Sequence, residues 1–481
     1  MSLIILGTAS HVGKSTIVAA LCRSLSKRNV SVAPFKSQNM SLNSYVTKDG
    51  KEIGIAQAIQ AFAAGVEPKA EMNPVLLKPK GDKTSQVVLL GKPYKDLKIG
   101  DYYKETDYLL NVAGESFKKL QSEYNNIVVE GAGGAAEMNL YERDIANILL
   151  ARKLGLPIII VGDIERGGIF AQIIGTYELL PDDVKKNVCG FIINKFRGDS
   201  QLFSEGIKII EEKTNLPVVG VLPYTKISIP SEDSLSLNDK KPVGFPVKIA
   251  VIKLPRISNF TDFEILENYA SVEYLDSKDL LLGYDCIIIP GTKNTVDDLI
   301  ELKNNGFDEK IKEVRLKKIP IIGICGGYQM LGKTIIDLGY ESENEKTIEG
   351  LGLLDTTTTF ESYDKTTVQV KRTANKIGPI LSSAGEAEGY EIHMGYTKLN
   401  NTKEAFAGEG AVSEDGLVIG TYMHGLFKNH DFSEALLKYL YSQKGCEFTG
   451  IIKDESEYSY DTLSEHFEKN VDMKKILSYF N

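Results

Sequence analysis

The feature that most constrains the fold of this chain is the glycine-rich stretch "GTASHVGKST" at positions 7–16. It follows the apolar run "LIIL" at 3–6 and precedes "STIVAALCRSLSKR" at 15–28, whose apolar residues recur at helical spacing. A strand, a glycine loop and a helix N-terminus in this order present backbone N–H groups and the positive end of a helix dipole to an anion. The chain is therefore predicted to begin with a strand–loop–helix unit that binds phosphate.

The spacing of this loop departs from the common phosphate-loop pattern. In G-x-x-x-x-G-K-[ST] the first glycine lies five residues before the second, but Thr8 holds that position here and Gly7 comes one residue early. Lys14 is expected to neutralise the β- and γ-phosphates of a nucleotide, and Ser15 to coordinate Mg²⁺. The residues of this loop predicted to bind ATP are Thr8, Gly13, Lys14, Ser15 and Thr16.

Two acidic residues stand where predicted strands end. Glu130 ends the apolar run in "VVEGAGG", and Asp163 ends the next run in "VGDIERGG". Carboxylates suit Mg²⁺, and doubly wound sheets bind ligands at the carboxyl ends of their strands. Both are predicted metal ligands with Ser15. The alternatives are a solvated turn carboxylate for Glu130 and a helix cap for Asp163.

The stretch "INKFRGD" at 193–199 bears on the choice of nucleotide. It resembles the guanine-reading N-K-x-D of GTPases, but Arg197 stands where the aspartate would accept the guanine hydrogen bonds. GTP specificity is therefore not supported. Asn194 could bind an adenine edge, so ATP is the predicted nucleotide.

Strand-like and helical stretches alternate along the chain in two series. At 481 residues the chain is long enough for two or three domains, and the alternation predicts parallel, doubly wound α/β sheets. The stretch "IPSEDSLSLNDKKPVGFP" loses periodicity and is typical of a linker. The residues after about 445 are expected to cap the second domain. The predicted parts are a synthetase domain at 1–228, a linker at 229–246, a second α/β domain at 247–445 and a helical extension at 446–481.

A second site is predicted at "IPIIGICGGYQMLGK". An apolar strand runs into Cys325 with glycines on both sides, and a helical pattern follows. This is the pattern of a nucleophile elbow, in which a strained turn exposes the nucleophile at a helix N-terminus. The alternative is a buried structural cysteine.

A cysteine nucleophile requires a base, and the chain has five histidines. His424, in "IGTYMHGLF", follows a strand-like run late in the same domain and is the predicted base. His393, in "YEIHMGYT", is the competing candidate and is expected instead to shape the pocket. The predicted oxyanion-hole donors are the backbone N–H groups of Gly326, Gly291 and Thr292.

Composition excludes several classes of protein. A net charge of −9 disfavours nucleic acid as a partner. The chain has no apolar run of the roughly 20 residues that a membrane span needs, and its N-terminal stretch is too short for a signal peptide. Five scattered cysteines without a C-x-x-C pair favour a reducing cytoplasm. The oligomeric state stays open.

The chain resembles the cobyric acid synthases, glutamine amidotransferases of cobalamin synthesis, along nearly its whole length. The resemblance lies in "GTASHVGKST", "PFKSQNMSLNSYVTKDGKEIGIAQA", "MNPVLLKPKGDKTSQVVLLG", "VEGAGG", "GDIERGGIFAQIIGT", "INKFRGD", "PGTKNT", "GICGGYQMLG", "EIHMGYT" and "MHGLF". The early glycine is a form that this family shares with dethiobiotin synthetase. The resemblance implies a dethiobiotin-synthetase-like ATP domain followed by a class I glutamine amidotransferase domain.

By resemblance, Cys325 is the glutaminase nucleophile and His424 its base. Ammonia released from L-glutamine would amidate the b, d, e and g carboxylates of adenosylcobyrinic acid a,c-diamide after ATP has activated them. Class I glutaminases typically carry a glutamate two residues after the histidine, where this chain has Leu426, so the group that orients His424 is left open. The residues expected to hold the anionic substrate are Lys36, Lys78, Arg166, Arg197 and His393.

Two alternatives remain at this point. Cobyrinic acid a,c-diamide synthase carries out the same chemistry on two other carboxylates, and "QNMSLNSYVT" and "DIERGG" favour the cobyric branch. A partitioning-type switch ATPase would use the phosphate loop alone and would have no need of the cysteine elbow.

Overall fold

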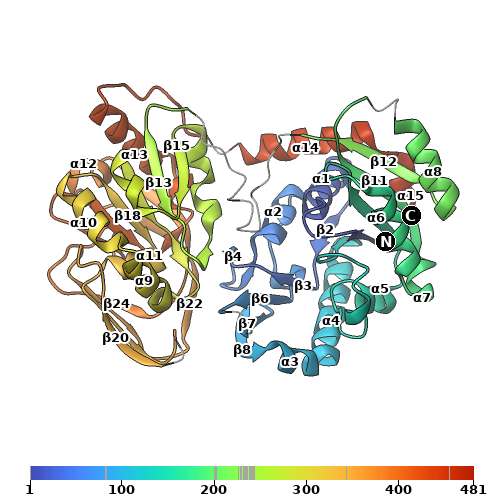
Figure 1. Ribbon diagram of the computed structural model, residues 1–481, viewed down its shortest axis with the longest axis horizontal. Helices are drawn as coiled ribbons and strands as arrows, with labels where there is room; N and C mark the ends of the chain where they lie inside the picture. Colours follow the sequence, from blue (N-terminus) through green and yellow to red (C-terminus); the bar gives the residue numbers. More distant parts are fainter. Residues whose placement is uncertain are drawn as a thin grey trace. The chain divides into compact units, whose positions relative to one another are not determined.

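A computed structural model gives the structure of the chain at residues 2–81, 84–199, 203–225, 227, 230, 237, 244–342, 344–453 and 455–480. Its contacts divide the chain into two compact units (Figure 1). The first unit comprises Met1–Ser41, Glu52–Pro230 and Glu455–Asn481, and the second comprises Leu42–Lys51 and Ser231–Asp454. Each unit therefore draws on stretches far apart in the sequence.

The first unit is built on a parallel sheet of six described strands. These strands are continuous apolar runs, which is typical of a parallel sheet covered on both faces; in "SLIILG" every residue is buried. The strand order is β12 (Val218–Pro223), β11 (Val188–Phe196), β10 (Ile158–Asp163), β1 (Ser2–Gly7), β9 (Asn126–Glu130) and β2 (Val32–Phe35). The ends of β9 and β10 thus flank the end of β1.

Helices and a smaller sheet complete the first unit. The smaller sheet has the order β3 (Gln38–Met40), β6 (Val75–Pro79), β7 (Thr84–Leu89) and β8 (Lys92–Lys98), and β5 (Glu52–Gly54) lies apart from it. The helices are α1 (Lys14–Lys27), α2 (Ile55–Ala63), α3 (Ile99–Tyr102), α4 (Thr106–Tyr124), α5 (Ile148–Leu154), α6 (Ile169–Leu179), α7 (Asp182–Lys185), α8 (Ser204–Thr214), α14 (Ser456–Asn470) and α15 (Met473–Ser478), with the short 3₁₀ turns η1 (Ala70–Met72), η2 (Tyr103–Glu105) and η3 (Met138–Leu140).

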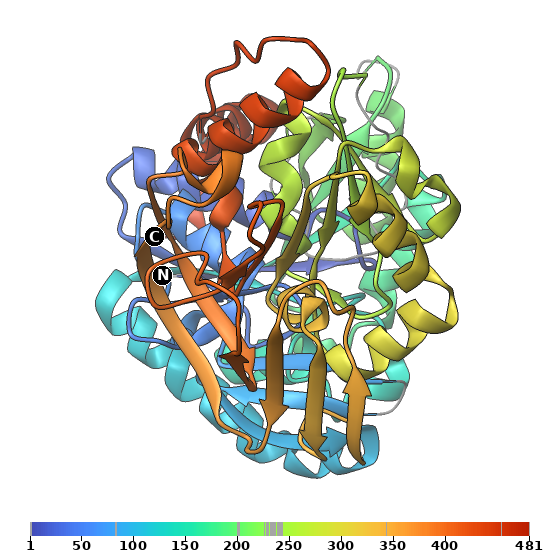
Figure 2. The same ribbon diagram turned by 90° about the vertical axis from the view of Figure 1, so that its left-hand side faces the viewer.

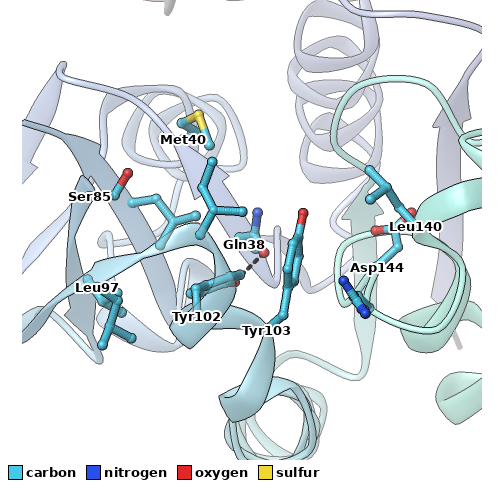
Figure 3. A pocket seen from close by; sticks show the side chains of 12 residues that line it. Gln38, Met40, Ser85, Leu97, Tyr102, Tyr103, Leu140 and Asp144 are labelled. Carbon is cyan, nitrogen blue, oxygen red and sulfur yellow. Dashed lines mark hydrogen bonds between the residues drawn. The ribbon is translucent and has the colours of Figure 1, made fainter. Parts of the chain in front are cut away.

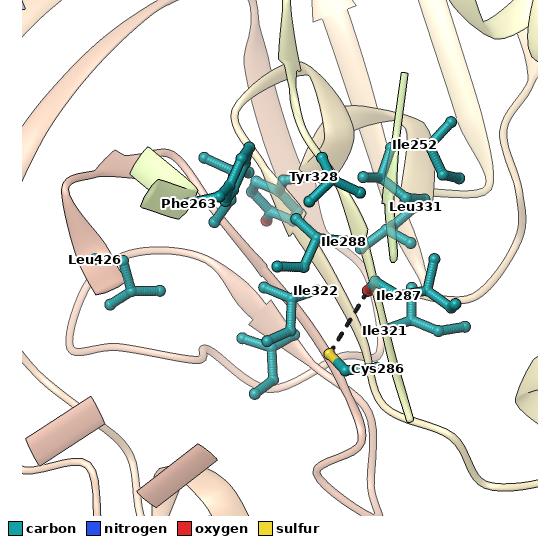
Figure 4. Close-up of a cluster of buried hydrophobic side chains, with 14 of the residues drawn as sticks. Ile252, Phe263, Cys286, Ile287, Ile288, Ile321, Ile322, Tyr328, Leu331 and Leu426 are labelled. Carbon is teal, nitrogen blue, oxygen red and sulfur yellow. Dashed lines mark hydrogen bonds between the residues drawn. The ribbon is translucent and has the colours of Figure 1, made fainter. Parts of the chain in front are cut away.

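The second unit also has a six-stranded sheet among the described residues, parallel except for its edge strand β25. Its order is β15 (Ser271–Leu275), β13 (Lys248–Ile252), β16 (Cys286–Ile289), β18 (Ile321–Ile324), β26 (Val418–Thr421) and β25 (Ala411–Val412). Isoleucines of β16 and β18 fill its core together with Phe263, Tyr328 and Leu426 (Figure 4).

Shorter strands and helices surround that sheet (Figure 2). The strands are β4 (Ser44–Val46), β14 (Ile257–Ser258), β17 (Gly291–Thr292), β19 (Thr334–Leu338), β20 (Glu345–Glu349), β21 (Thr356–Phe360), β22 (Lys365–Thr373), β23 (Glu386–Met394), β24 (Tyr396–Leu399) and β27 (Met423–His424). The helices are α9 (Thr295–Asn304), α10 (Phe307–Leu316), α11 (Gly326–Leu331), α12 (Gly378–Leu381) and α13 (His430–Gln443), with the 3₁₀ segments η6 (Phe260–Asn268), η7 (Lys278–Gly283) and η8 (Leu426–Lys428).

The predicted fold class is confirmed, since both units are α/β with parallel central sheets. The division of the chain differs from the prediction at its C-terminal end. Residues from Glu455 onward belong to the first unit, where α14 lies against α1. Arg23 of α1 bonds Asp461 at 2.8 Å, and apolar residues such as Phe467 are buried on the same helix. Most of the predicted linker at 229–246 lies outside the described residues. No helix in the described ranges is both long and apolar enough to cross a membrane.

Candidate active sites

The phosphate loop joins β1 to α1, and Lys14 opens the helix after Gly13, whose φ is 99°. The Lys14 side chain turns back over the loop and is only 6% exposed. Its Nζ donates hydrogen bonds to Ala9 O at 3.0 Å and Gly133 O at 2.7 Å. A Cβ atom on Gly7 would lie 2.8 Å from that Nζ, so the early glycine makes room for the lysine. The unusual spacing of the glycines thus leaves room for the Lys14 ammonium group to lie over the loop.

Glu130 lies beside the start of α1 and is almost fully buried. Its Oε1 accepts from Ser15 Oγ at 2.7 Å and from Lys36 Nζ at 3.0 Å, and its Oε2 accepts from Gln60 Nε2 at 2.5 Å. Burial alone would raise the pKa of this carboxyl, but the Lys36 ammonium and the bonds from Gln60 and Ser15 outweigh burial and lower it. Glu130 is therefore a carboxylate held in place, not a solvated turn residue.

These contacts test whether the site suits Mg²⁺. Ser15 and Glu130 bring a hydroxyl and a carboxylate oxygen together at the phosphate loop, which is the oxygen donor chemistry Mg²⁺ takes alongside phosphates. Asp163 does not join them in the described residues. Its Oδ1 accepts from Glu165 N at 2.8 Å and its Oδ2 lies 2.8 Å from Lys195 Nζ. The residues present fit a cation that two protein groups hold. Asp163 is not a helix cap either, since it accepts from Glu165 N within the loop and α6 begins after Gly168.

The other residues predicted for the nucleotide lie around the loop. Thr8 Oγ1 donates to Gln172 Oε1 at 3.3 Å, and Thr16 is half-buried in the first turn of α1. Asn194 Nδ2 donates to Val12 O at 2.9 Å and its Oδ1 accepts from Lys195 N at 2.8 Å, so Asn194 braces the phosphate loop.

The cations predicted to hold an anionic substrate have different surroundings. Lys36 and Lys78 are each 5% exposed. Lys36 forms a buried ion pair with Glu130, and Lys78 forms one with Glu52. Arg197 pairs with Glu165 and lies over the Tyr224 ring at 3.4 Å. Arg166 is exposed on the loop that follows β10.

A cavity of about 200 Å³ opens in the first unit (Figure 3). Its walls are mainly apolar and aromatic, and Tyr102, Tyr103 and Leu140 point into it. Arg143 lies on the wall with its guanidinium over the Tyr103 ring at 5.0 Å. None of the five substrate-binding residues predicted above is among its lining residues.

A short chain of hydrogen bonds joins this cavity to the loop after Glu130. Asp144, a lining residue, accepts from Asn147 Nδ2 at 2.9 Å. The same Asn147 side chain bonds both the N–H and the carbonyl of Ala132, at 3.0 and 2.7 Å. The cavity and the phosphate loop are therefore neighbouring parts of one region of the first unit.

In the second unit Cys325 lies between β18 and α11 with φ 53° and ψ −110°. A backbone in this sparsely populated region is strained, and such strain is concentrated at functional turns. The side chain is 7% exposed, with Sγ 3.5 Å from Ile392 O. The chain thus forms the sharp strand-to-helix turn that was predicted around this cysteine.

His424 is fully buried against Cys325, with which its side chain forms a hydrogen bond. His424 Nδ1 lies 2.7 Å from Asp262 Oδ2, which leaves Nε2 to face the thiol. Burial alone would lower the pKa of His424, but the Asp262 carboxylate and the bond to Cys325 raise it to about 10. The imidazole is therefore held as a cation beside the sulfur.

Asp262 is the residue that sequence reasoning missed. It lies on η6, is 4% exposed, and also accepts from Gly425 N at 3.1 Å, so it holds both the ring and the backbone of the histidine turn. Leu426, which has the place of the usual glutamate, is buried in the core. Asp262 precedes His424 by 162 positions, so no local spacing could have revealed it; the only signal was an acid between two phenylalanines in "NFTDF".

His393, the competing candidate for the base, lies on β23. The His393 ring stacks on Tyr422 at 3.6 Å and its Nδ1 lies 3.2 Å from Gly395 O. Tyr390 and Ile392, on the other face, are next to His424 and Cys325. The structure thus brings together Cys325 and His424, and not His393.

The predicted oxyanion-hole turn lies against the elbow. A Cβ atom on Gly326 would be 3.2 Å from Thr292 N, and one on Gly291 would be 3.2 Å from His424 Cε1. These backbone positions therefore lie close to one another and to His424, as the predicted oxyanion hole requires.

We expect Asp262→Asn to reduce the kcat of the glutaminase reaction that the resemblance implies by on the order of 100-fold, because a neutral side chain no longer holds the imidazolium in place. Losing the carboxylate also lowers the pKa of His424, so the alkaline limb of the kcat–pH profile should move to lower pH. Glutamate release measured across pH checks both effects. Asp337→Asn is the matched control, since Asp337 is a buried aspartate that bonds backbone N–H groups of its own turn. An unshifted alkaline limb in Asp262→Asn would refute the role.

Comparison with known proteins finds a family model for each of the two predicted α/β domains. Residues 3–236 match the family model described as the CobQ/CobB/MinD/ParA nucleotide binding domain, and residues 248–432 match the CobB/CobQ-like glutamine amidotransferase domain. A protein of Methanoculleus marisnigri named "Probable cobyric acid synthase" is 61% identical, over 100% of this chain and 99% of that protein. A protein of the same name from Methanosphaerula palustris is 62% identical, over 99% and 98%.

These matches place the chain among two-domain enzymes that join a nucleotide-binding domain to a glutamine amidotransferase domain. Within that class the chain belongs to the cobyric acid synthase family. The predicted family is thereby confirmed, and the cobyric branch is favoured over both the a,c-diamide synthase and the switch ATPase.

Proposed function

We propose that this protein uses ATP and L-glutamine to amidate the b, d, e and g carboxylates of adenosylcobyrinic acid a,c-diamide. The observation that supports the proposal is that one chain of this family carries both a lysine-bearing phosphate loop and a Cys–His–Asp arrangement. We also infer a cytoplasmic location, because all five cysteines are free.

In the second unit the Cys325 thiolate attacks the side-chain amide carbon of glutamine. The carbonyl oxygen becomes an oxyanion, for which the N–H groups of Gly326 and Thr292 are the proposed donors. His424 then gives its proton to the leaving nitrogen, the C–N bond breaks, and ammonia leaves a γ-glutamyl thioester. Water, from which His424 takes a proton, then attacks the thioester carbon. The C–S bond breaks, which releases glutamate and restores the Cys325 thiolate beside the protonated His424. Asp262 keeps the imidazole oriented through both steps.

In the first unit an oxygen of a substrate carboxylate attacks the γ-phosphorus of ATP. The bond to the β-phosphate oxygen breaks, which releases ADP and leaves an acyl phosphate. The proposed role of Lys14 is to neutralise the phosphate charge that builds up in this step. Mg²⁺, held by Ser15 and Glu130, would supply further charge neutralisation at the phosphates. Ammonia then displaces phosphate from the acyl carbon to form the amide.

We propose the cavity beside Tyr103 as the place where the corrin ring binds. A corrinoid is a broad macrocycle with an apolar periphery and ionised side arms, which suits apolar, aromatic walls with one arginine. Met40 and Ile99, both lining residues, are 59% and 56% exposed, so apolar surface surrounds the opening. The hydrogen-bonded connection to Ala132 supports a location next to the activating site.

Tyr103→Ala should raise the KM for the corrinoid by roughly tenfold, because an aromatic contact of about 1–1.5 kcal/mol is lost. The KM for glutamine should not change. Steady-state amidation with each substrate varied in turn measures both constants, and Tyr108→Ala, an exposed tyrosine nearby in the chain, is the control. An unchanged corrinoid KM would remove Tyr103 from the substrate site.

The reaction itself is tested by incubating the protein with glutamine, a nucleotide and either cobyrinic acid or its a,c-diamide, followed by mass spectrometry of the corrinoid. We expect four amidations of the a,c-diamide with ATP and far slower turnover with GTP, since Arg197 replaces the guanine-reading aspartate. Amidation that stops at two groups on cobyrinic acid would identify the a,c-diamide branch instead. Equal rates with GTP would contradict the nucleotide assignment.

A further inference from the structure

The chain crosses from one sheet to another just before His424. β26 ends at Thr421 in the six-stranded sheet, whereas β27 begins at Met423 and pairs with β23 instead. Tyr422 lies between the two strands and belongs to neither, although it is only 6% exposed. Because a buried backbone N–H needs an acceptor, the N–H of Tyr422 has to be satisfied from outside both ladders. We call residues 421–423 the crossing.

Glu409 supplies the acceptor that the crossing needs. Its Oε1 accepts from Tyr422 N at 2.5 Å and its Oε2 accepts from Thr421 Oγ1 at 2.6 Å. The residue is 8% exposed and lies on the loop that leads into β25, the antiparallel neighbour of β26. Gly410, with φ 73°, lets this loop come close, since a Cβ atom there would be 2.5 Å from Gly420 O. One buried carboxylate thus binds two successive residues of the crossing.

The crossing in turn holds both members of the reactive pair. Thr421 O accepts from Cys325 N at 2.8 Å, so the backbone of the nucleophile turn is bound to it. Thr421 Oγ1, which donates to Glu409, also accepts from Met423 N at 3.0 Å, next to His424. A shift of the crossing would therefore change how the imidazole and the thiol face each other.

Charged and titratable side chains surround the Glu409 carboxyl. They are Glu391 and His393 of β23, Arg372 of β22, Tyr328 of α11 and Tyr422 of the crossing itself. Burial raises the pKa of Glu409 to about 7, because burial and the Glu391 carboxylate outweigh the two hydrogen bonds from the crossing and the Arg372 guanidinium. Arg372 itself pairs with Glu391 at 2.8 Å. Glu409 therefore changes its charge close to neutral pH.

We propose that Glu409 is a positioning residue of the glutaminase site, whose carboxylate keeps the crossing in the shape that places His424 beside Cys325. An ionised carboxyl accepts hydrogen bonds at both oxygens, whereas a protonated one carries an O–H on one of them and loses an acceptor there. Hydrolysis of glutamine then requires the ionised form and slows as Glu409 takes up a proton. This inference rests on the proposed function, which supplies the roles of Cys325 and His424.

The first test is the pH dependence of glutamate release by the full-length protein. For the wild type we expect kcat to rise about tenfold from about pH 6 to about pH 8, as a single ionisation in the middle of that range requires. Glu409→Gln keeps the size of the side chain and one acceptor but cannot ionise. Its kcat at the upper pH should be roughly tenfold lower, because a charge-assisted hydrogen bond becomes a neutral one, and should no longer depend on pH in this range. The KM for glutamine should not change.

The neighbouring charges provide a second test that a purely structural role would not satisfy. Glu391→Gln removes the carboxylate that raises the pKa of Glu409 and leaves Arg372 to lower it, so the acid limb of the kcat–pH profile should move to lower pH. Arg372→Gln has the opposite effect on the pKa and should move the limb to higher pH. Glu404→Gln, which changes an exposed glutamate of the same loop, is the control and should keep the wild-type profile.

Thermal unfolding separates positioning from structural support. Because the pKa of Glu409 is raised in the folded protein, ionising this carboxyl lowers stability, an effect that is absent below its ordinary pKa and complete above the raised one. At about pH 8, Glu409→Gln should therefore melt at or above the wild-type temperature. A much lower melting temperature, a wild-type pH profile in Glu409→Gln, or shifts of the limb in one direction for both charge variants would overturn the positioning role. Glutamate release that persists in Cys325→Ala would instead overturn the proposed function.

Discussion

Cys325→Ala is expected to abolish glutamate release and glutamine-dependent amidation, with a loss on the order of 10⁴-fold or more. The γ-glutamyl thioester cannot form without the sulfur, and no other described cysteine lies beside His424: Cys286, the other cysteine of this sheet, is buried in the core among isoleucines (Figure 4). Glutamate release and amide formation on the corrinoid are the two measurements. Cys286→Ala serves as the matched control and should retain both activities.

The same variant should regain amidation when ammonium salt is supplied at alkaline pH. Free ammonia can reach the acyl phosphate without the glutaminase, because activation takes place at the phosphate loop of the other unit. Glutamate release at the wild-type rate in Cys325→Ala would show that the nucleophile has been wrongly assigned.

Lys14→Ala is expected to lose amidation by roughly 10²–10³-fold with either nitrogen source, because the charge on the phosphates loses its closest cation. The buried lysine also bonds Ala9 O and Gly133 O, so its removal loosens the loop as well. Initial rates of ADP formation and amidation check this. Lys118→Ala, a lysine exposed on α4, is the control. Rescue of Lys14→Ala by ammonium would contradict the assignment.

Much of the fold could be predicted because its strands carry the local signals of a parallel sheet. Runs such as "SLIILG" and "LPIIIVGD" are apolar throughout, are followed by glycine or polar turns, and became β1 and β10. The packing of the C-terminal helix α14 could not be predicted in the same way. Its amphipathic pattern predicts a helix but does not indicate which element that helix packs against. Arg23 and Asp461, which join α14 to α1, are 438 residues apart.

The candidate sites could be predicted where a residue lies on a strand-to-helix turn, as Lys14 and Cys325 do. They could not be predicted where a contact depends on the tertiary fold. Asp262 reaches His424 from another element, and Lys36 reaches Glu130 across 94 residues. Because Lys36 and Glu130 form a buried ion pair, Glu130→Gln would leave the Lys36 ammonium without its carboxylate. Breaking a buried pair in this way typically costs about 3–5 kcal/mol of stability.

The central claim is that one chain holds two separate sites, one that makes ammonia and one that consumes it. The measurement that tests it most directly is the amidation rate of the corrinoid a,c-diamide by Cys325→Ala and by Lys14→Ala, each with glutamine and with ammonium. The account predicts that ammonium restores amidation in Cys325→Ala and fails to do so in Lys14→Ala, while Lys14→Ala still releases glutamate. Equal rescue of both variants, or of neither, would contradict it.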